Sequence, residues 1–125
     1  MLYQNNSNSS LIDYTLFESL PGYGLIVNYN GDSLAITNDL VDFLKIDKTK
    51  SIPSFLDLFE QFKNFNGFDE LKYKNHIEIL HPISPNRNIC LQFTFKEIEI
   101  RGNKHITIWI KDKTKARKHD RVKKI

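Results

Sequence analysis

The last third of the chain alternates apolar and polar residues, and this alternation constrains the fold more than any other feature of the sequence. Three segments carry it, "HIEILHP" at 76–82, "ICLQFTF" at 89–95 and "HITIWIK" at 105–111. Successive side chains of a strand point to opposite faces, so the pattern predicts strands that bury one face. We therefore expect an antiparallel sheet with one apolar face.

The sequence allows two registers for the pairing of the last two of these strands. The apolar phase slips at Lys96-Glu97, which predicts a β-bulge. A two-residue Gly102-Asn103 turn is possible, but a three-residue loop at 102–104 pairs Ile100 with Ile106. A slip of one residue turns a whole face of a strand, so we favour the loop that keeps the apolar residues together.

A hairpin is predicted in the first third by Asn30-Gly31, which lies between two apolar segments. Both residues accept the positive φ that a two-residue hairpin turn requires. The turn pairs Leu25 with Ile36 and Val27 with Leu34 on one face, and it leaves Ile26 and Ala35 on the other.

Helical patterns fill the remaining segments. Leu11, Tyr14, Phe17 and Leu20 recur at a helical period after Ser10, which has the spacing of a helix cap. Asn38 is expected to cap a short helix over 39–46. Ser54 is expected to cap a second helix, over 53–62, whose phenylalanines form one apolar face, and a helical turn is expected at 68–73.

The composition is that of a soluble globular domain. The 125 residues are 40% hydrophobic and 26% charged, with one cysteine, so a disulfide framework is excluded and a reducing compartment is indicated. No apolar run reaches the roughly 18–20 residues that cross a bilayer, and the N-terminus lacks the pattern of a signal peptide. We expect a cytoplasmic protein with no membrane segment within this chain.

The positive charge belongs to the C-terminal end. Residues 111–125 hold eight Lys or Arg and two Asp, a net charge of +6, and the whole chain carries +3, so the other 110 residues sum to −3. The segment favours a basic helix that leads out of the domain. A solvated end, or electrostatic binding to nucleic acid or an anionic membrane, remains an alternative, although no nucleic acid partner is expected.

The order of these elements resembles a PAS domain over about residues 11–116. "LFESLPGYGLIVNYNGDSLAITN" is similar to the family's opening helix, strand, Asn/Asp-Gly turn, second strand and following Asn. "IWIKDKT" resembles its closing strand, with the Asp-x-Thr signature at Asp112 and Thr114. The resemblance implies an α+β fold with a five-stranded antiparallel sheet in the order 2-1-5-4-3. Short helices would cover one face, between an N-terminal cap helix and a C-terminal linker helix.

The resemblance also implies an organisation and a function. Residues 1–9 would be a disordered tail, 10–114 the PAS domain and 115–125 the linker helix. Such modules sense or dimerise and relay a signal, often in two-component systems, to an attached histidine kinase, cyclase or transcription regulator. Asp112 and Thr114 would then fix the angle at which the chain leaves the sheet, since both side chains can accept backbone N–H groups.

The residues give little support for the cofactors that members of this family bind. Cys90 is on a strand and not on a middle helix, so it does not match the flavin-reactive cysteine. Haem is the alternative, with His81 on the apolar face as the better ligand and His76 as the second. His76, Glu78 and His81 do not converge on a metal, because residues five apart share no strand face. The inward residues are almost all apolar, which favours a filled core, with an apolar guest as the other possibility.

Catalysis has no supporting motif: the sequence contains no nucleophile elbow, phosphate loop or paired carboxylates. Isolated acids are read as helix caps and solvated faces; they are Asp42, Asp57, Asp69 and Glu70. We expect a module that is not an enzyme.

Trp109 alternates out of phase with its isoleucine neighbours and therefore points to the other face of the sheet. Together with Ile26 and Ala35 it predicts an apolar patch there. The N-terminal helix, through Leu11, Tyr14 and Phe17, could cover this patch within one chain, or a second subunit could pack on it. We favour a homodimer in which that helix takes part.

Overall fold

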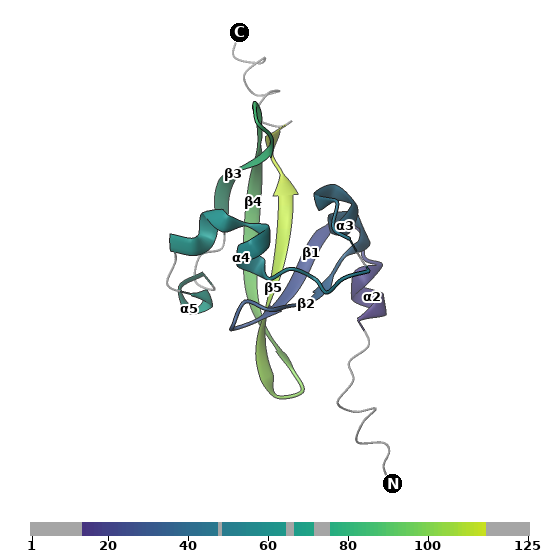
Figure 1. Cartoon of the computed structure of the whole chain (residues 1–125). Helices are drawn as coiled ribbons and strands as arrows, with labels where there is room; N and C mark the ends of the chain where they lie inside the picture. Colours follow the sequence, from purple (N-terminus) through teal and green to yellow (C-terminus); the bar gives the residue numbers. More distant parts are fainter. Residues whose placement is uncertain (1–13, 48, 65–66, 72–75, 115–125) are drawn as a thin grey trace.

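The computed structural model describes residues 14–47, 49–64, 67–71 and 76–114 (Figure 1). The helices are α2 (Thr15–Glu18), α3 (Asn38–Leu44), α4 (Phe55–Leu58), the 3-10 helix η1 (Glu60–Asn64) and α5 (Phe68–Leu71). The strands are β1 (Tyr23–Asn28), β2 (Ser33–Ile36), β3 (Ile77–Ser84), β4 (Arg87–Ile100) and β5 (Asn103–Asp112). The predicted tail at 1–9, the start of the cap helix with Leu11, and the predicted linker helix at 115–125 lie outside the described residues.

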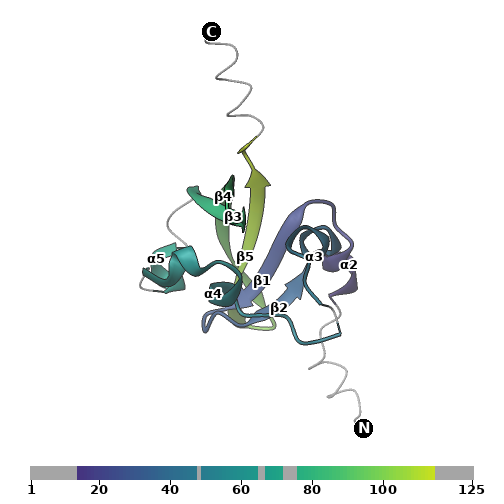
Figure 2. The same ribbon diagram turned by 45° about the horizontal axis from the view of Figure 1, so that its top comes forward.

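The five strands form one antiparallel sheet in the order β2-β1-β5-β4-β3, which confirms the predicted topology. The last strand of the sequence is thus the middle strand of the sheet. Figures 1 and 2 show α4 in front of the sheet, α5 to the left of it, and α2 and α3 beside β1 and β2. We use "inner face" for the side of the sheet that the helix α4 covers and "outer face" for the opposite side.

The β1–β2 hairpin differs from its prediction at the turn. Leu25 pairs with Ile36 and Ile26 with Ala35 as expected, but Val27 faces Ser33 and not Leu34, because the register shifts after Ile26. Of the two expected turn residues, Asn30 and Gly31, only Gly31 has a positive φ, of 89°. The side chain of Asn28 accepts the N–H groups of Asn30 and Asp32 at 2.9 and 3.0 Å, which stabilises a longer loop than the dipeptide alone predicts.

The β4–β5 register was predicted wrongly. β4 is continuous, with no bulge at Lys96, and Ile100 pairs with Asn103. The turn is Arg101-Gly102, with φ of 52° and 81°, and not the loop 102–104 or Gly102-Asn103. Two positive φ values match the twist of a hairpin, so turn geometry outweighed the apolar phase. Ile98 therefore lies opposite His105 on the outer face.

Glu97 takes the inner-face position that the prediction gave to an isoleucine. It lies opposite Ile106, which is fully buried. The hydroxyl of Tyr29 donates a hydrogen bond to the Glu97 carboxylate. That partner makes an acidic side chain tolerable at the end of the core face, since a half-buried carboxylate without a donor would be costly.

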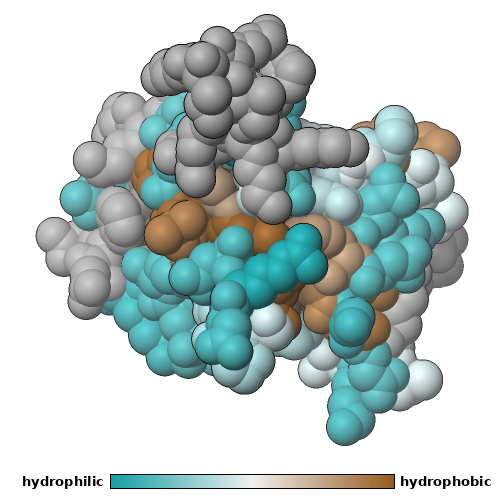
Figure 3. Space-filling model, turned by 90° about the horizontal axis from the view of Figure 1, so that it is seen from above, coloured by the Kyte–Doolittle hydropathy of each residue, from teal (hydrophilic) through white to brown (hydrophobic). Residues whose placement is uncertain are grey.

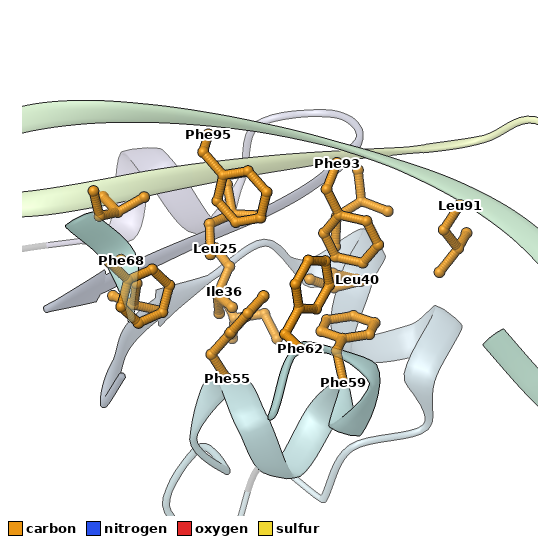
Figure 4. Close-up of a cluster of buried hydrophobic side chains, with 14 of the residues drawn as sticks. Leu25, Ile36, Leu40, Phe55, Phe59, Phe62, Phe68, Leu91, Phe93 and Phe95 are labelled. Atoms are coloured by element: carbon orange, nitrogen blue, oxygen red, sulfur yellow. The ribbon is translucent and has the colours of Figure 1, made fainter. Parts of the chain in front are cut away.

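Phenylalanine side chains fill the space between the inner face and the helices (Figure 4). Phe55, Phe59 and Phe62 point from α4 and η1 toward Phe93 and Phe95 on β4, with ring centroids 4.9–6.3 Å apart across the two layers. All five are at most 2% exposed. The core is therefore packed with aromatic rings, as the sequence favoured.

Two helix starts show how the sequence sets these elements. Ser54 caps α4 and accepts the N–H of Asp57 at 3.3 Å, as predicted. The cap of α3 is Thr37 and not Asn38, and its hydroxyl accepts from Leu40. The predicted helix over 53–62 divides at Phe59, which has a non-helical φ of −135°, and continues as the 3-10 helix η1.

Candidate functional site

The end of β5 is fastened to β4 by side chains that the sequence singled out. Thr114 donates its N–H to the Asp112 carboxylate at 2.9 Å, and its hydroxyl accepts the N–H of Cys90 at 2.7 Å. The N–H of Lys113 donates to the carbonyl of Cys90 at 2.8 Å. Both backbone groups of Cys90 are thus held by residues just beyond the last ladder pair, Leu91 and Asp112. We name Cys90, Asp112, Lys113 and Thr114 the exit cluster.

The exit cluster joins the end of β5 to the neighbouring strand β4. An Asp side chain that binds the N–H two residues later makes a compact turn, and the Thr114 hydroxyl joins that turn to the neighbouring strand. Figure 3 views the molecule from the end at which β5 finishes, where apolar residues gather in the middle of the face and hydrophilic residues surround them. The predicted relay residues Asp112 and Thr114 are therefore brought together, with Cys90 as a partner that the sequence did not reveal.

The outer face at Trp109 is only partly as predicted. Trp109 does point to this face, where its ring lies 5.6 Å from the ring of Phe17 in α2. Ile26 and Ala35 share the face, but they are 5% and 0% exposed within one chain. These two residues do not form an exposed patch, because the chain itself already covers them.

The exposed apolar residues beside this region lie in α2 and just after it. Leu16 is 82% exposed and Leu20 44%, whereas Phe17 and Tyr14 are half-buried. Burial raises the pKa of the Tyr14 hydroxyl. Part of the cap helix thus packs on the domain, and its leucines face solvent in a single chain.

The two candidate haem ligands lie on opposite faces of the sheet. His76 is exposed and its Nδ1 lies 2.8 Å from Nε2 of Gln92 on the outer face. His81 faces inward against Phe59, at 5.4 Å between ring centroids, and burial lowers its pKa. In the part of the chain that the structure describes, the Nδ1 of His81 has no hydrogen-bond partner.

Phenylalanine rings fill the core between the sheet and the helices, and one of them, Phe59, packs against His81. His81 also lines two surface hollows of about 440 and 330 Å³. Cys90 is on the outer face, and its Sγ is 3.7 Å from a carboxylate oxygen of Glu78. A cysteine that reacts with a flavin bound in the core would face the core, whereas Cys90 faces the other side of the sheet.

Neither a metal centre nor a membrane span is found in the described ranges. No three His, Cys, Asp or Glu side chains of residues 14–47, 49–64, 67–71 and 76–114 cluster closely enough to hold a metal ion. Within the same residues, every helix is too short or too polar to cross a bilayer.

Comparison with known proteins finds similarity at the level of structure. No family model matches the sequence, and no curated protein matches it. A PAS domain from a two-component sensor histidine kinase is similar with a TM-score of 0.60 and 11% identity, over 79% of this chain and 91% of that one.

Two further PAS domains have a TM-score of 0.55 and 14% identity. One is from a Desulfitobacterium hafniense protein and is matched over 78% of this chain and 98% of its own. The other is from an HTR-like protein of Haloarcula marismortui and is matched over 86% and 98%. Identities this low establish a shared fold and leave function to the residues of this chain. The chain has the PAS fold that its sequence pattern indicated.

Proposed function

We propose that this chain is a cytoplasmic, non-enzymatic sensory and dimerisation module that relays a signal through the segment after β5. The receiver would be an attached histidine kinase, cyclase or transcription regulator. The observation that supports this most directly is the exit cluster. Two hydrogen bonds join Thr114 and Lys113 to Cys90 on the neighbouring strand, and a third joins Thr114 to Asp112. A frayed end would not need such a connection.

The position of β5 explains how a signal would reach this cluster. β5 is the middle strand and pairs with β1 and β4 along most of its length. Its inward residues Ile106, Ile108 and Ile110 are at most 6% exposed against the packed core. Close-packed interiors transmit displacement and do not absorb it, so a shift of the core or of the outer face would move β5 as a unit.

A second copy would dock through two exposed leucines, Leu16 in α2 and Leu20 just after it, beside the ring of Trp109. Leu16 and Leu20 are exposed apolar residues beside Phe17, which already contacts Trp109. Burial of such side chains is the usual driving force of a homodimer contact. Ile26 and Ala35 would support this interface from beneath and would not touch the partner, because they are buried already.

The relay is tested by placing residues 1–125 in front of the catalytic part of a sensor histidine kinase and measuring autophosphorylation. Thr114→Val removes the hydroxyl that accepts from Cys90, and we expect a severalfold change in kinase output with little change in folding. Thr107→Val is the matched control, since its hydroxyl donates to the Lys96 carbonyl at 3.2 Å in the middle of β5, away from the exit cluster. Equal output from both variants and the parent would contradict the relay.

The dimer is tested by sedimentation velocity. Leu16→Glu adds charge at an 82% exposed position and should yield monomers without loss of stability. Leu56→Glu is the control, at a 39% exposed leucine of α4 on the other side of the sheet. A Leu16→Glu chain that sediments like the parent would remove α2 from the interface.

A further inference from the structure

A hollow lies on the outer face of the sheet because of one glycine. Gly24 pairs with Trp109 across β1 and β5, and a Cβ at Gly24 would lie 2.5 Å from Cζ3 of the indole. The ring of Trp109 therefore lies against the bare backbone of β1, where Phe17 holds it. Thr94, its partner on β4, is small, so the surface beside the ring is left open.

This hollow, which we name the outer groove, has a volume of about 280 Å³. Its lining includes Gly22, His76, Gln92, Thr94, Trp109 and Lys111. The volume is slightly below the roughly 300–1,000 Å³ of sites for drug-sized ligands, which limits an occupant to one or two rings. Tyr23 and Ile110 complete the lining and join the groove to the edge of the core, whereas the six residues named above lie outside the core cluster.

Two polar side chains of the outer groove, Gln92 and Thr94, are hydrogen-bonded to a third, His76. Gln92 Nε2 lies 2.8 Å from His76 Nδ1, and the Thr94 hydroxyl lies 3.3 Å from the same atom. When the amide nitrogen of Gln92 donates, Nδ1 accepts and the proton of the neutral imidazole is on Nε2. Lys111 is exposed directly opposite Gln92 on β5 and adds a positive charge.

No carboxylate is present among the described residues that line the outer groove. Two acids lie at its edge and have partners of their own: Glu78 is opposite Gln92 in the β3–β4 ladder, and Asp39 contacts Gly22. A carboxylate oxygen of Glu78 is 3.7 Å from the sulfur of Cys90, and a carboxylate oxygen of Asp39 accepts the N–H of Gly22 at 2.8 Å. The charge and the donors of the groove therefore favour an anion.

We propose that the outer groove binds a small aromatic carboxylate. Its ring would pack on the indole of Trp109, and its carboxylate would lie toward Lys111 and the Nε2–H of His76. The lining offers an aromatic face and a charged donor, so a ligand needs both a ring and a negative charge. A simple anion would not contact the indole, and an uncharged ring would not pair with the lysine. The binding does not depend on the relay, since it requires only the groove.

The test measures binding of phenylacetate by calorimetry and by the fluorescence of Trp109, the single tryptophan of the chain. A ligand of this size should bind with a dissociation constant on the order of 0.1–1 mM. Phenylacetamide, its neutral counterpart, and inorganic phosphate should each bind at least about tenfold more weakly, because each lacks one half of the recognition.

Two variants locate the site. Lys111→Gln should weaken phenylacetate binding about tenfold, whereas Lys104→Gln, at an exposed lysine near the other end of β5, should not change it. Thr94→Leu should abolish binding by filling the groove, with a thermal melt confirming that the variant is folded.

Four results would overturn the proposal: no binding of phenylacetate at 10 mM, equal binding of the amide, equal binding of phosphate, or the same affinity in the two lysine variants. Binding that occurs only in the Leu16→Glu monomer would also overturn it, because the groove would then be part of the contact between two copies.

Discussion

Gly24→Ala tests the packing on which the outer face depends. The new Cβ would lie 2.5, 2.8 and 2.9 Å from Cζ3, Cη2 and Cε3 of Trp109. Such separations do not occur between carbon atoms in proteins, so the indole must move. Gly24 is in the strand β1 and has no positive φ, so alanine fits its backbone and only the side-chain clash opposes the change.

The size of the effect follows from two opposing terms. Overpacking of this kind costs about 1–3 kcal/mol, while the greater stiffness of alanine in a strand stabilises by about 0.5–1 kcal/mol. The free energy of unfolding should fall by roughly 0.5–2 kcal/mol. For a domain of this length about 4 °C corresponds to 1 kcal/mol, so the midpoint of thermal unfolding should fall by about 2–8 °C. Calorimetry or circular dichroism measures this shift.

A double-mutant cycle identifies the cause. In a Trp109→Ala background the clash is absent, and Gly24→Ala should become neutral or stabilising by up to about 1 kcal/mol. If Gly24→Ala destabilises both backgrounds equally, or leaves the parent unchanged, the contact between the indole and the β1 backbone is not what requires glycine. The same substitution should also displace the ring toward Thr94 and weaken phenylacetate binding.

Substitutions at three other positions test single interactions by chemical denaturation. Thr37→Val should cost about 2–4 kcal/mol, because a fully buried hydroxyl that bonds Gly24 and caps α3 is lost, while Thr37→Ser should cost about 1 kcal/mol. Tyr29→Phe should cost about 1–2 kcal/mol by leaving Glu97 without its donor. The lowered pKa of His81 means that the unfolded chain binds this proton more readily, so stability should fall as pH drops below the ordinary value of 6.5. His81→Phe should remove that part of the pH dependence, and an unchanged pH profile would contradict it.

The sequence predicted the features that repeat along it. Period-two alternation placed the strands, and helical spacing identified the phenylalanines that pack on Phe93 and Phe95. The Asp-x-Thr pattern identified Asp112 and Thr114 because their roles are local and depend on two-residue spacing. Cys90 could not be found in this way, since its bond to Thr114 joins residues 24 apart.

The register errors have a physical origin in turn residues. Arg101 adopts a positive φ of 52°, which is unusual for a residue with a side chain and which no apolar pattern reveals. The inward acid at Glu97 accepts a hydrogen bond from Tyr29, which lies 68 positions earlier. The alternation of apolar residues therefore placed Ile98 and Ile100 on the core face wrongly, because this pattern cannot detect a distant hydrogen-bond donor.

Trp109 connects the two proposals through one strand. Its ring rests on Gly24 and Phe17, and its neighbours Ile108 and Ile110 are held in the core, so the position of β5 is set from both faces at this point. Asp112 follows three residues later, where the exit cluster fixes the departing chain to Cys90. A ligand or a second subunit that presses on the indole would therefore act on the same rigid strand whose end the exit cluster holds. Because the filled core leaves β5 little room to move inward, the displacement would be passed along the strand toward Thr114.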